Sequence, residues 1–371
     1  MDRESSPGRG RTLAVNSTLP QSPPEVEENL LVASVTKGAE RKGKGKSRLL
    51  RQVAVYVVLA ALLYFALRNA PFTEIWKALT QLRLSQLAIL FVINALVIVS
   101  IAARWWVIVR AENPAVPFLP LIRYRLSVFG LSYFTPGPQV GGEPLQVLYL
   151  QRNHGVSFAR ATSAVIMDKL LELLGNFILI GVGFTAAVRV GLISGNGTQA
   201  LGSLIPVAAI LTWPVIHLIL LHRGRHPISS LLRSAISLIG SPGWVRLIMV
   251  SERMAAAFAR RRFKALLIAL GFSMLAWAGM AAEYFLIASF LNINLSFEQT
   301  LGALTAALFA FLLPLPGGLG ALEASQVYAM TTLGYAPALG ISLSLIMRGR
   351  DILNGGLGLL LAGKFIRDLN S

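Results

Sequence analysis

Two short polar stretches could support binding chemistry in a chain that is otherwise rich in apolar residues. PGPQVGGEPLQV begins at Pro136 and PGGLGALEASQV begins at Pro316, and both read P-G-x5-E-x-x-Q-V. The Glu and the Gln of each motif are spaced i,i+3, so they share one face of a helix. The spacing predicts a polar site for a headgroup or a proton-carrying carboxylate; alternatively, each Glu caps its own half-helix. The pairs are Glu143 with Gln146 and Glu323 with Gln326.

Proline and glycine interrupt each of these stretches. We expect Pro-Gly to end one half-helix and the Glu to open the next, which frees backbone N–H groups at a partly positive helix N-terminus. The pattern predicts structural hinges at Pro136, Gly137, Gly141, Gly142, Pro316, Gly317, Gly318 and Gly320.

The apolar helix that follows each motif carries charged residues of its own. Ionisable groups inside a membrane are costly, so they normally face a cavity and pair with one another. The spacing favours the pairs Lys169–Glu172 and Arg348–Asp351, and a surplus Lys169 or Arg350 could bind a phosphate. The alternative is closed ion pairs that hold helices together. The predicted binding residues here are Asp168, Lys169, Arg348, Arg350 and Asp351, with Arg123 and Arg125 where an anionic headgroup would arrive.

Other polar residues predict structural roles and no catalytic centre. Glu283 and His217 stand alone in apolar runs, which favours interhelical hydrogen bonds, and Arg104-Trp105-Trp106 is typical of an interfacial anchor. The chain has no cysteine, and its four histidines show no metal-ligand spacing. We therefore expect no metal, no cofactor and no enzymatic activity, because hydrolase and nucleotide-binding motifs are also missing.

Composition indicates a membrane protein. The 371 residues are 54% hydrophobic and 14% charged, with a mean hydropathy of +0.63. Soluble domains carry roughly a quarter charged residues. The net charge of +17 could suggest nucleic acid, but the basic residues lie between apolar runs, so we exclude a nucleic-acid partner. The expected class is an all-α polytopic membrane protein.

Apolar runs of about 20 residues predict the spans. We expect about six to eight transmembrane helices: six spans with the two interrupted stretches, 117–150 and 299–335, as re-entrant hairpins, or alternatively eight spans. The six spans are 52–68, 85–104, 158–188, 201–221, 265–291 and 337–363.

Charge placement predicts the orientation. Residues 1–48 read as a disordered, basic cytoplasmic tail, whose basic patch either contacts anionic lipid or only orients the chain. The loop 222–264 holds nine Lys/Arg against one acid, so it is also expected in the cytoplasm. The pattern predicts a multi-pass membrane domain over 49–367, with both termini cytoplasmic and the two hairpins entering from opposite sides.

An internal repeat links the two motifs. At an offset of 180, eleven of the 48 pairs from Pro136 to Gly183 are identical. Three predicted spans separate the starts of the repeats, about 117–188 and 299–366, so the second copy is inverted. Inverted repeats with Gly/Pro-broken segments indicate a transporter whose site lies near the membrane midplane.

Three motifs resemble a known family. GGE at Gly141–Glu143, LPLPGGLGALE at Leu313–Glu323 and the charged helix that begins with MDKLLELLG resemble the lysylphosphatidylglycerol synthase transmembrane region, also called the flippase-like UPF0104 family, over roughly 50–366. The resemblance implies an inner-membrane protein that moves lipids or polyprenyl-linked headgroups. It places family Glu positions at Glu143 and Glu323, and it puts Lys169 where relatives often carry Arg. It also implies that the aminoacyltransferase domain of fused members, and hence synthase activity, is missing.

The resulting functional prediction is a lipid or polyprenyl-linked headgroup flippase. Its expected partners are membrane lipids with anionic or isoprenoid headgroups, and a membrane-protein partner or a homo-oligomer is compatible with it. Two alternatives stay open: an integral-membrane lipid-modifying enzyme, and a membrane partner of a separately encoded glycosyltransferase.

Overall fold

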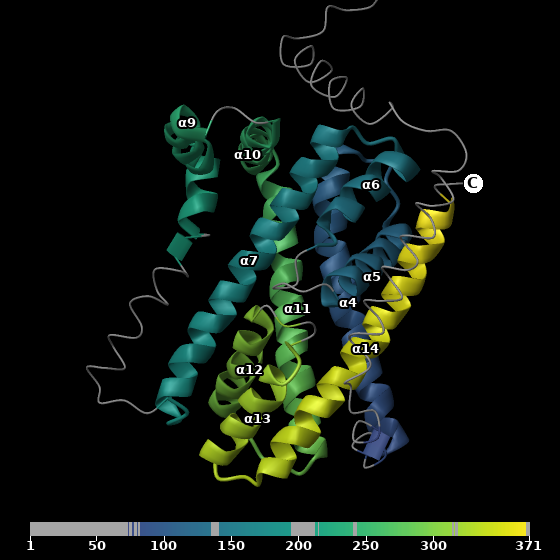
Figure 1. Ribbon diagram of the computed structural model, residues 1–371, viewed down its shortest axis with the longest axis vertical. Helices are drawn as coiled ribbons and strands as arrows, with labels where there is room; N and C mark the ends of the chain where they lie inside the picture. The colour runs from purple at the N-terminus through teal and green to yellow at the C-terminus, as the bar shows by residue number, and fades with distance from the viewer. Residues whose placement is uncertain are drawn as a thin grey trace, which may run out of the picture. The chain divides into compact units, whose positions relative to one another are not determined.

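Helices form all of the regular secondary structure in the part of the chain that the structure describes (Figure 1). The structure is a computed structural model that describes residues 82–134, 141–193, 215–239, 243–313 and 318–368, with a few single positions between them. The all-α class is confirmed. The chain divides into two units, Met1–Lys44 and Gly45–Ser371, and the described residues belong to the second. The predicted tail, the span 52–68 and most of 201–221 lie outside the described residues.

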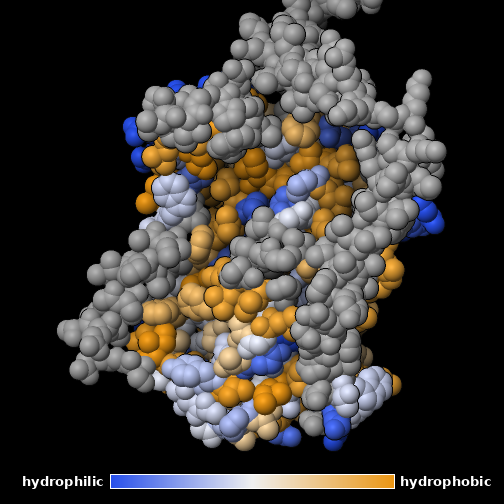
Figure 2. Space-filling view, viewed as in Figure 1, coloured by the Kyte–Doolittle hydropathy of each residue, from blue (hydrophilic) through white to orange (hydrophobic). Residues whose placement is uncertain are grey.

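Three described helices are long and apolar enough to cross a membrane. They are α4 (Leu84–Glu112), α7 (Phe158–Arg189, from Arg160 onward) and α11 (Phe263–Phe290), which confirms three predicted spans. A fourth helix, α14 (Pro337–Asp368), is 32 residues long, but charged residues near its middle interrupt the apolar run. Large apolar side chains such as Phe91, Ile268 and Leu360 are exposed on these helices. Figure 2 shows a hydrophobic surface over the middle of this face, with hydrophilic residues mainly toward its ends.

Both interrupted stretches fold as pairs of short helices. The first pair is α5 (Phe118–Phe134) and α6 (Glu143–His154), and the second is α12 (Phe297–Leu312) and α13 (Ala321–Thr332). At 12 to 17 residues, each helix is shorter than the roughly 20 residues that a full crossing needs. Figure 1 shows α5 and α6 toward one end of the long helices and α12 and α13 at the other. The predicted hairpins at opposite ends are therefore present.

Local residue chemistry sets the ends of these short helices. Pro144 stands in the first turn of α6, where the missing N–H costs nothing, and Gly155 ends the helix with φ 63°. The helix α12 begins at a capping box, in which Ser296 Oγ accepts from Gln299 N and Gln299 Oε1 accepts from Ser296 N. Gly320 opens α13 at φ 78°, a conformation that favours glycine.

The structural repeat is longer than the repeat predicted from the sequence. Adding 180 to the bounds of α4, α5, α6 and α7 gives 264–292, 298–314, 323–334 and 338–369. These ranges fall within two residues of α11, α12, α13 and α14. Each repeat is therefore a four-helix unit. The repeat predicted from the sequence lacked the first of these helices, because α4 and α11 share an apolar character rather than identical residues.

In each repeat, the first helix of the hairpin packs on the last long helix of the other repeat. The helices α4 and α11 pack together, α5 packs on α14, and α12 packs on α7. Glycines permit these crossings: a Cβ at Gly358 would lie 2.0 Å from Leu126 O, and one at Gly183 would lie 1.8 Å from Thr305 Oγ1. Because α5 and α12 each pack on the long helix of the other repeat, the two halves form one interlocked helical layer.

The basic segment 222–264, which we expected to be a loop, is largely helical. It contains α9 (Pro227–Ile239) and α10 (Gly243–Arg261), and α10 packs on α7. Apolar residues recur along both helices at helical spacing, which gives each an apolar face to bury. Glu252 of α10 accepts hydrogen bonds from the N–H groups of Ile228 and Ser229, so it caps α9. His217 Nε2 lies 3.9 Å from Glu252 Oε1, which is too far for the hydrogen bond that we predicted for His217.

Candidate functional site

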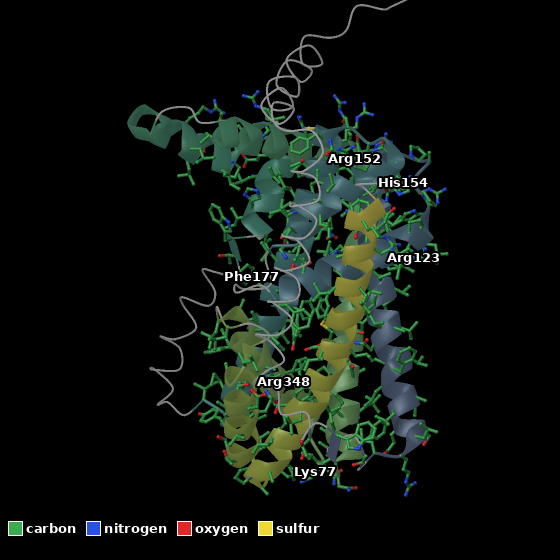
Figure 3. The ribbon with its side chains drawn as sticks, turned by 45° about the vertical axis from the view of Figure 1, so that its right-hand side comes forward. Lys77, Arg123, Arg152, His154, Phe177 and Arg348 are labelled. Atoms are coloured by element: carbon green, nitrogen blue, oxygen red, sulfur yellow. The ribbon has the colours of Figure 1, made fainter. Side chains whose placement is uncertain are left out.

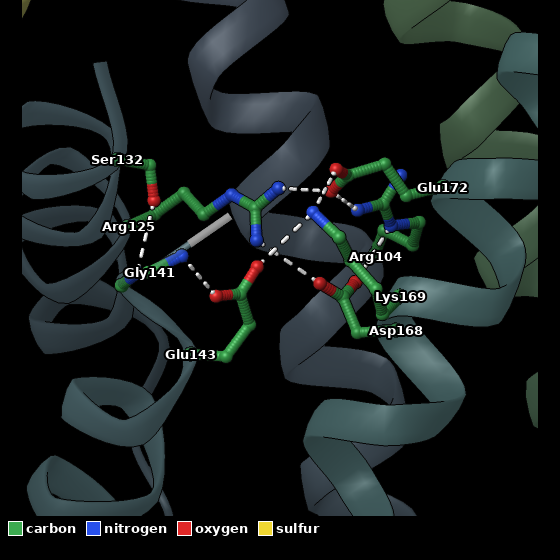
Figure 4. A network of polar contacts seen from close by, with 9 residues as sticks. Arg104, Arg125, Ser132, Gly141, Glu143, Asp168, Lys169 and Glu172 are labelled. Atoms are coloured by element: carbon green, nitrogen blue, oxygen red, sulfur yellow. Dashed lines mark hydrogen bonds and ion pairs between the residues drawn. The ribbon is translucent and has the colours of Figure 1, made fainter. Parts of the chain in front are cut away.

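Six charged side chains from all four helices of the first repeat form one network, the first charge cluster (Figure 4). The helices α4 and α5 contribute one arginine each, the N-terminus of α6 contributes a glutamate, and α7 contributes three residues. Three of the side chains are cationic and three are carboxylates. The members are Arg104, Arg125, Glu143, Asp168, Lys169 and Glu172.

The buried part of the first charge cluster is a closed set of ion pairs. Asp168 and Glu172 are i,i+4 on α7, so both face the same way. Arg104 reaches Asp168 at 2.6 Å and Glu172 at 3.1 Å, while Arg125 reaches the same two carboxylates at 3.0 and 2.5 Å. The side chains of Arg104 and Asp168 are only 3% and 2% exposed. These four groups fasten α4 and α5 to α7.

The accessible edge of this cluster is the pair Lys169 and Glu143. Lys169 Nζ lies 3.2 Å from Glu143 Oε1 and 2.7 Å from Glu172 Oε1. The side chains of Lys169 and Glu143 are 28% and 22% exposed. The other oxygen of Glu143, Oε2, accepts from the N–H of Gly141 at 2.8 Å. One carboxylate oxygen of Glu143 therefore accepts a hydrogen bond at the start of its own half-helix, and the other pairs with a cation on α7.

The second repeat holds a corresponding network, the second charge cluster. It draws on α11 for Glu283, on α13 for Glu323, and on α14 for Arg348, Arg350 and Asp351. Arg350 reaches Glu283 at 2.7 Å and Asp351 at 2.8 Å, so one guanidinium serves two carboxylates. Figure 3 labels Arg348 in the half of the long helices that contains α12 and α13.

Glu323 repeats the arrangement of Glu143. Its Oε2 accepts from the N–H of Gly320 at 2.9 Å, and its Oε1 lies 2.6 Å from Arg348 Nη2. Arg348 is 2% exposed and also donates to the carbonyl of Gly318 at 3.4 Å, whereas Glu323 is 24% exposed. In both repeats the glutamate of the motif thus bridges the hairpin to the following long helix.

Helix geometry places both clusters well inside the helical layer. Asp168 is the eleventh residue of α7 and Arg348 is the twelfth of α14. At 1.5 Å per residue, each lies about 16 to 18 Å along its helix, or roughly half of a 30 Å hydrocarbon core. The two helices run in opposite directions (Figure 1). Each cluster therefore approaches the middle of the layer from its own end.

Arg104 corrects the interpretation of Arg104-Trp105-Trp106 as an interfacial anchor. Arg104 is 2% exposed and Trp105 is fully buried, because the arginine points to the carboxylates of α7. The signal in the sequence was a single arginine at the end of a predicted span, and pairing it with Asp168 required knowledge of which helices touch. Glu283 was predicted to bond between helices, and its bond to Arg350 confirms this.

The surplus cations that we expected at Lys169 and Arg350 are not surplus. Lys169 pairs with Glu143 and Glu172, which confirms its predicted i,i+3 pair, and Arg350 pairs with Glu283 and Asp351. Neither cation is therefore unpaired, as that prediction required, and phosphate binding at Lys169 or Arg350 stays a prediction. Sequence spacing shows pairs along one helix, whereas Glu143 and Glu283 come from other helices.

The remaining predicted residues divide between the two repeats. Gln326 is buried and hydrogen-bonded to Tyr284 and Ala303, whereas Gln146 is equally buried, but its Nε2 has no partner in the described part of the chain. Arg125 belongs to the first charge cluster, but Arg123 is exposed on α5 and stands outside it (Figure 3).

Four of the eight predicted hinge residues can be assessed. Gly141, Gly318 and Gly320 have φ of 144°, 62° and 78°, values that favour glycine. Gly142 is required for space, because a Cβ there would lie 2.6 Å from Val128 O. Pro136, Gly137, Pro316 and Gly317 lie outside the described residues.

Comparison with known proteins identifies the family. The model of the family described as "Lysylphosphatidylglycerol synthase TM region" matches residues 52–355. A "UPF0104 membrane protein" of Pyrococcus horikoshii is 24% identical over 266 residues, which cover 67% of this chain and 77% of that relative. No solved structure matches the chain. Since the family match covers most of the 371 residues and includes both charge clusters, the chain belongs to the lysylphosphatidylglycerol synthase transmembrane-region family.

Proposed function

We propose that this protein binds the headgroup of an anionic or polyprenyl-linked lipid and moves it between the two leaflets of the inner membrane. The observation that supports this proposal is a pair of equivalent ion pairs, which we call the two bridges. One joins Glu143 to Lys169 and the other joins Glu323 to Arg348. Each bridge joins a re-entrant hairpin to a long helix, and the two hairpins lie at opposite ends of the layer.

Exchange with a phosphate would begin at the glutamates, because Glu143 and Glu323 are both partly exposed whereas Arg348 is buried behind Glu323. Glu143, Lys169 and Glu323 are between 22% and 28% exposed, while Arg104 and Asp168 behind the first bridge are only 3% and 2% exposed. An arriving phosphate would replace the glutamate at Lys169 or at Arg348. Lysine offers a point charge and arginine offers a planar fork, so the two ends would grip the phosphate differently. The released glutamate keeps its backbone N–H partner at Gly141 or Gly320.

The buried ion pairs supply the rigid part of this device. Asp168 and Glu172 are held by two arginines, so replacing the Lys169 bridge leaves α4, α5 and α7 fastened. Opening the Lys169 bridge would then remove only the ion pair between α6 and α7. In transporters with inverted repeats and broken helices, one part moves against a more rigid part, so that a single binding site opens to each side of the membrane in turn.

Substitution of the two bridging glutamates tests the proposal. Proteoliposomes are loaded with a fluorescent phospholipid reporter, and its transfer between leaflets is measured by chemical quenching from outside. We expect Glu143→Gln and Glu323→Gln each to abolish transfer while the purified variants elute and melt as folded protein. The matched control is Glu298→Gln, which breaks the exposed pair with Arg189 and should transfer normally. Normal transfer in both bridging variants would refute the proposal.

A second candidate function is an integral-membrane lipid-modifying enzyme. The family description favours it, because it names the membrane region of a synthase. Acid–base chemistry at Glu143, Asp168 or Glu323 would be required. Mass spectrometry of lipids incubated with the purified protein separates the two functions, since an enzyme creates new lipid species and a flippase only relocates existing ones.

A further inference from the structure

The two charge clusters differ by one charge. The first contains three cations and three carboxylates, so it balances. The second contains the guanidiniums of Arg348 and Arg350 but the three carboxylates of Glu283, Glu323 and Asp351. Within the described residues, the fully ionised second cluster therefore carries one surplus negative charge.

Burial makes that surplus expensive. The side chains of Glu283 and Asp351 are only 3% and 9% exposed, and both lie on long helices that expose large apolar side chains. An isolated ionised carboxylate in a low-dielectric interior costs so much that the group normally takes up a proton instead.

The contacts locate the surplus on the pair Glu283 and Asp351. Glu323 has Arg348 at 2.6 Å and the Gly320 N–H at 2.9 Å, so its charge is compensated. Glu283 and Asp351 must share the single guanidinium of Arg350, at 2.7 and 2.8 Å. One guanidinium can neutralise only one of these two carboxylates.

Among the described residues, the groups that face this pair supply no further positive charge. From α4 comes the uncharged Asn94, which hydrogen-bonds Glu283 and accepts from Asn354. From α5 comes the phenol of Tyr133, from α13 comes Glu323, and α14 adds Arg348 beside Asp351. Asn94 and the phenol of Tyr133 add no positive charge, and Glu323 and Arg348 are already counted, so the described helices leave the imbalance in place.

A metal ion does not fit the described geometry. Metal sites need several carboxylate or imidazole ligands that converge on one point, and the described residues contain no such group. Glu283 and Asp351 instead bind Arg350, whose guanidinium occupies the position that a cation would take. A proton needs only one carboxylate oxygen.

We propose that Glu283 and Asp351 share one bound proton at neutral pH, and that this proton is the coupling ion of the transport cycle. The proton site stands on the charge inventory alone, whereas the coupling rests on the proposed function. Uptake converts one carboxylate to a carboxylic acid, and release returns the proton to water on one side of the membrane. Arg350 then serves whichever carboxylate is ionised.

Infrared spectroscopy of the purified full chain in lipid nanodiscs tests the proton site without any transported lipid. We expect the wild type at neutral pH to show a carbonyl band of a protonated carboxylic acid. The band should be lost in Glu283→Gln and in Asp351→Asn, because each variant leaves two carboxylates against two guanidiniums. The matched control Glu172→Gln, in the first cluster, should retain it.

The outcomes separate the proton site from the coupling. A wild type without the band, or a band that persists in both second-cluster variants, overturns the proton site; should a variant fail to fold, the wild-type spectrum still decides. In proteoliposomes, reporter transfer by the wild type should accelerate when a pH gradient is imposed, and transfer that ignores the gradient overturns the coupling. A wild type that transfers no lipid refutes the proposed function but leaves the infrared result standing.

Discussion

The first and second charge clusters are built on the same four-helix unit, yet they pair their buried charges differently. Position 104 of the first repeat holds an arginine, and the equivalent position 284 of the second holds a tyrosine. Arg104 joins Arg125 in closing two carboxylates on α7. Among the described residues, the second repeat shows no such closed set, and Arg350 pairs with two carboxylates from different helices. The backbone symmetry is therefore retained while the charge symmetry is broken.

Gln146 and Gln326, which stand at equivalent positions, also differ in their hydrogen-bond partners. Tyr284 donates its hydroxyl hydrogen to Gln326, and that glutamine is fully engaged inside the second repeat. In the first repeat Arg104 points to Asp168 and Glu172 instead, and Gln146 Nε2 keeps no partner among the described residues.

The largest effect should follow from breaking the closed ion pairs of the first cluster. Arg104→Met removes one of the two guanidiniums shared by Asp168 and Glu172, and it leaves a buried negative charge. Removing one partner of a buried pair costs about 3–5 kcal/mol. We expect a loss of that size in the free energy of unfolding, measured by chemical denaturation in detergent micelles.

Arg104→Lys serves as the control for that prediction. Lysine retains the charge but not the fork, so it should recover part of the loss. A stability for Arg104→Met equal to that of the wild type would show that the first cluster does not hold the helices together.

The second largest effect should come from crowding the close crossing of α5 and α14, where helices of the two repeats meet. In Gly358→Ala the new Cβ would lie 2.0 Å from the carbonyl oxygen of Leu126, so α14 and α5 must separate. Overpacking of this kind costs roughly 1–3 kcal/mol, and the upper end applies because the obstacle is backbone.

The neighbouring glycine provides a matched control in the same helix. A Cβ at Gly356 would meet no atom within 4 Å, and alanine is the better helix former. Gly356→Ala should leave the thermal midpoint in detergent unchanged or slightly raised. Equal losses in the two variants would contradict the close crossing of α5 and α14.

The smallest effect should follow from removing the hydroxyl that distinguishes the second repeat. Tyr284→Phe deletes the hydrogen bond to the buried Gln326, and we expect a cost of about 1 kcal/mol. Thermal unfolding measured by tryptophan fluorescence can resolve this change. If Tyr284→Phe proves as damaging as Arg104→Met, the two equivalent positions carry similar loads and the contrast between the repeats fails.

Much of the architecture could be predicted from the sequence because it depends on local patterns. Apolar runs predicted the long helices at α4, α7 and α11, and Pro and Gly predicted the breaks that bound the short helices. The i,i+3 pair of Lys169 and Glu172 also followed from spacing. By contrast, the basic segment 222–264 was misread as a loop, since its charge obscured the apolar faces of α9 and α10.

By itself, the sequence determined the class, the repeat and the positions of Glu143 and Glu323, because helical period, breakers and a constant offset are properties of order along the chain. Only the tertiary structure decided which charges meet. Arg104 reaches Asp168 across 64 residues and Arg350 reaches Glu283 across 67. Buried charges select partners by distance in space. The packing of α4 on α7 and of α11 on α14 therefore turned a predicted anchor and a predicted surplus cation into members of the two charge clusters.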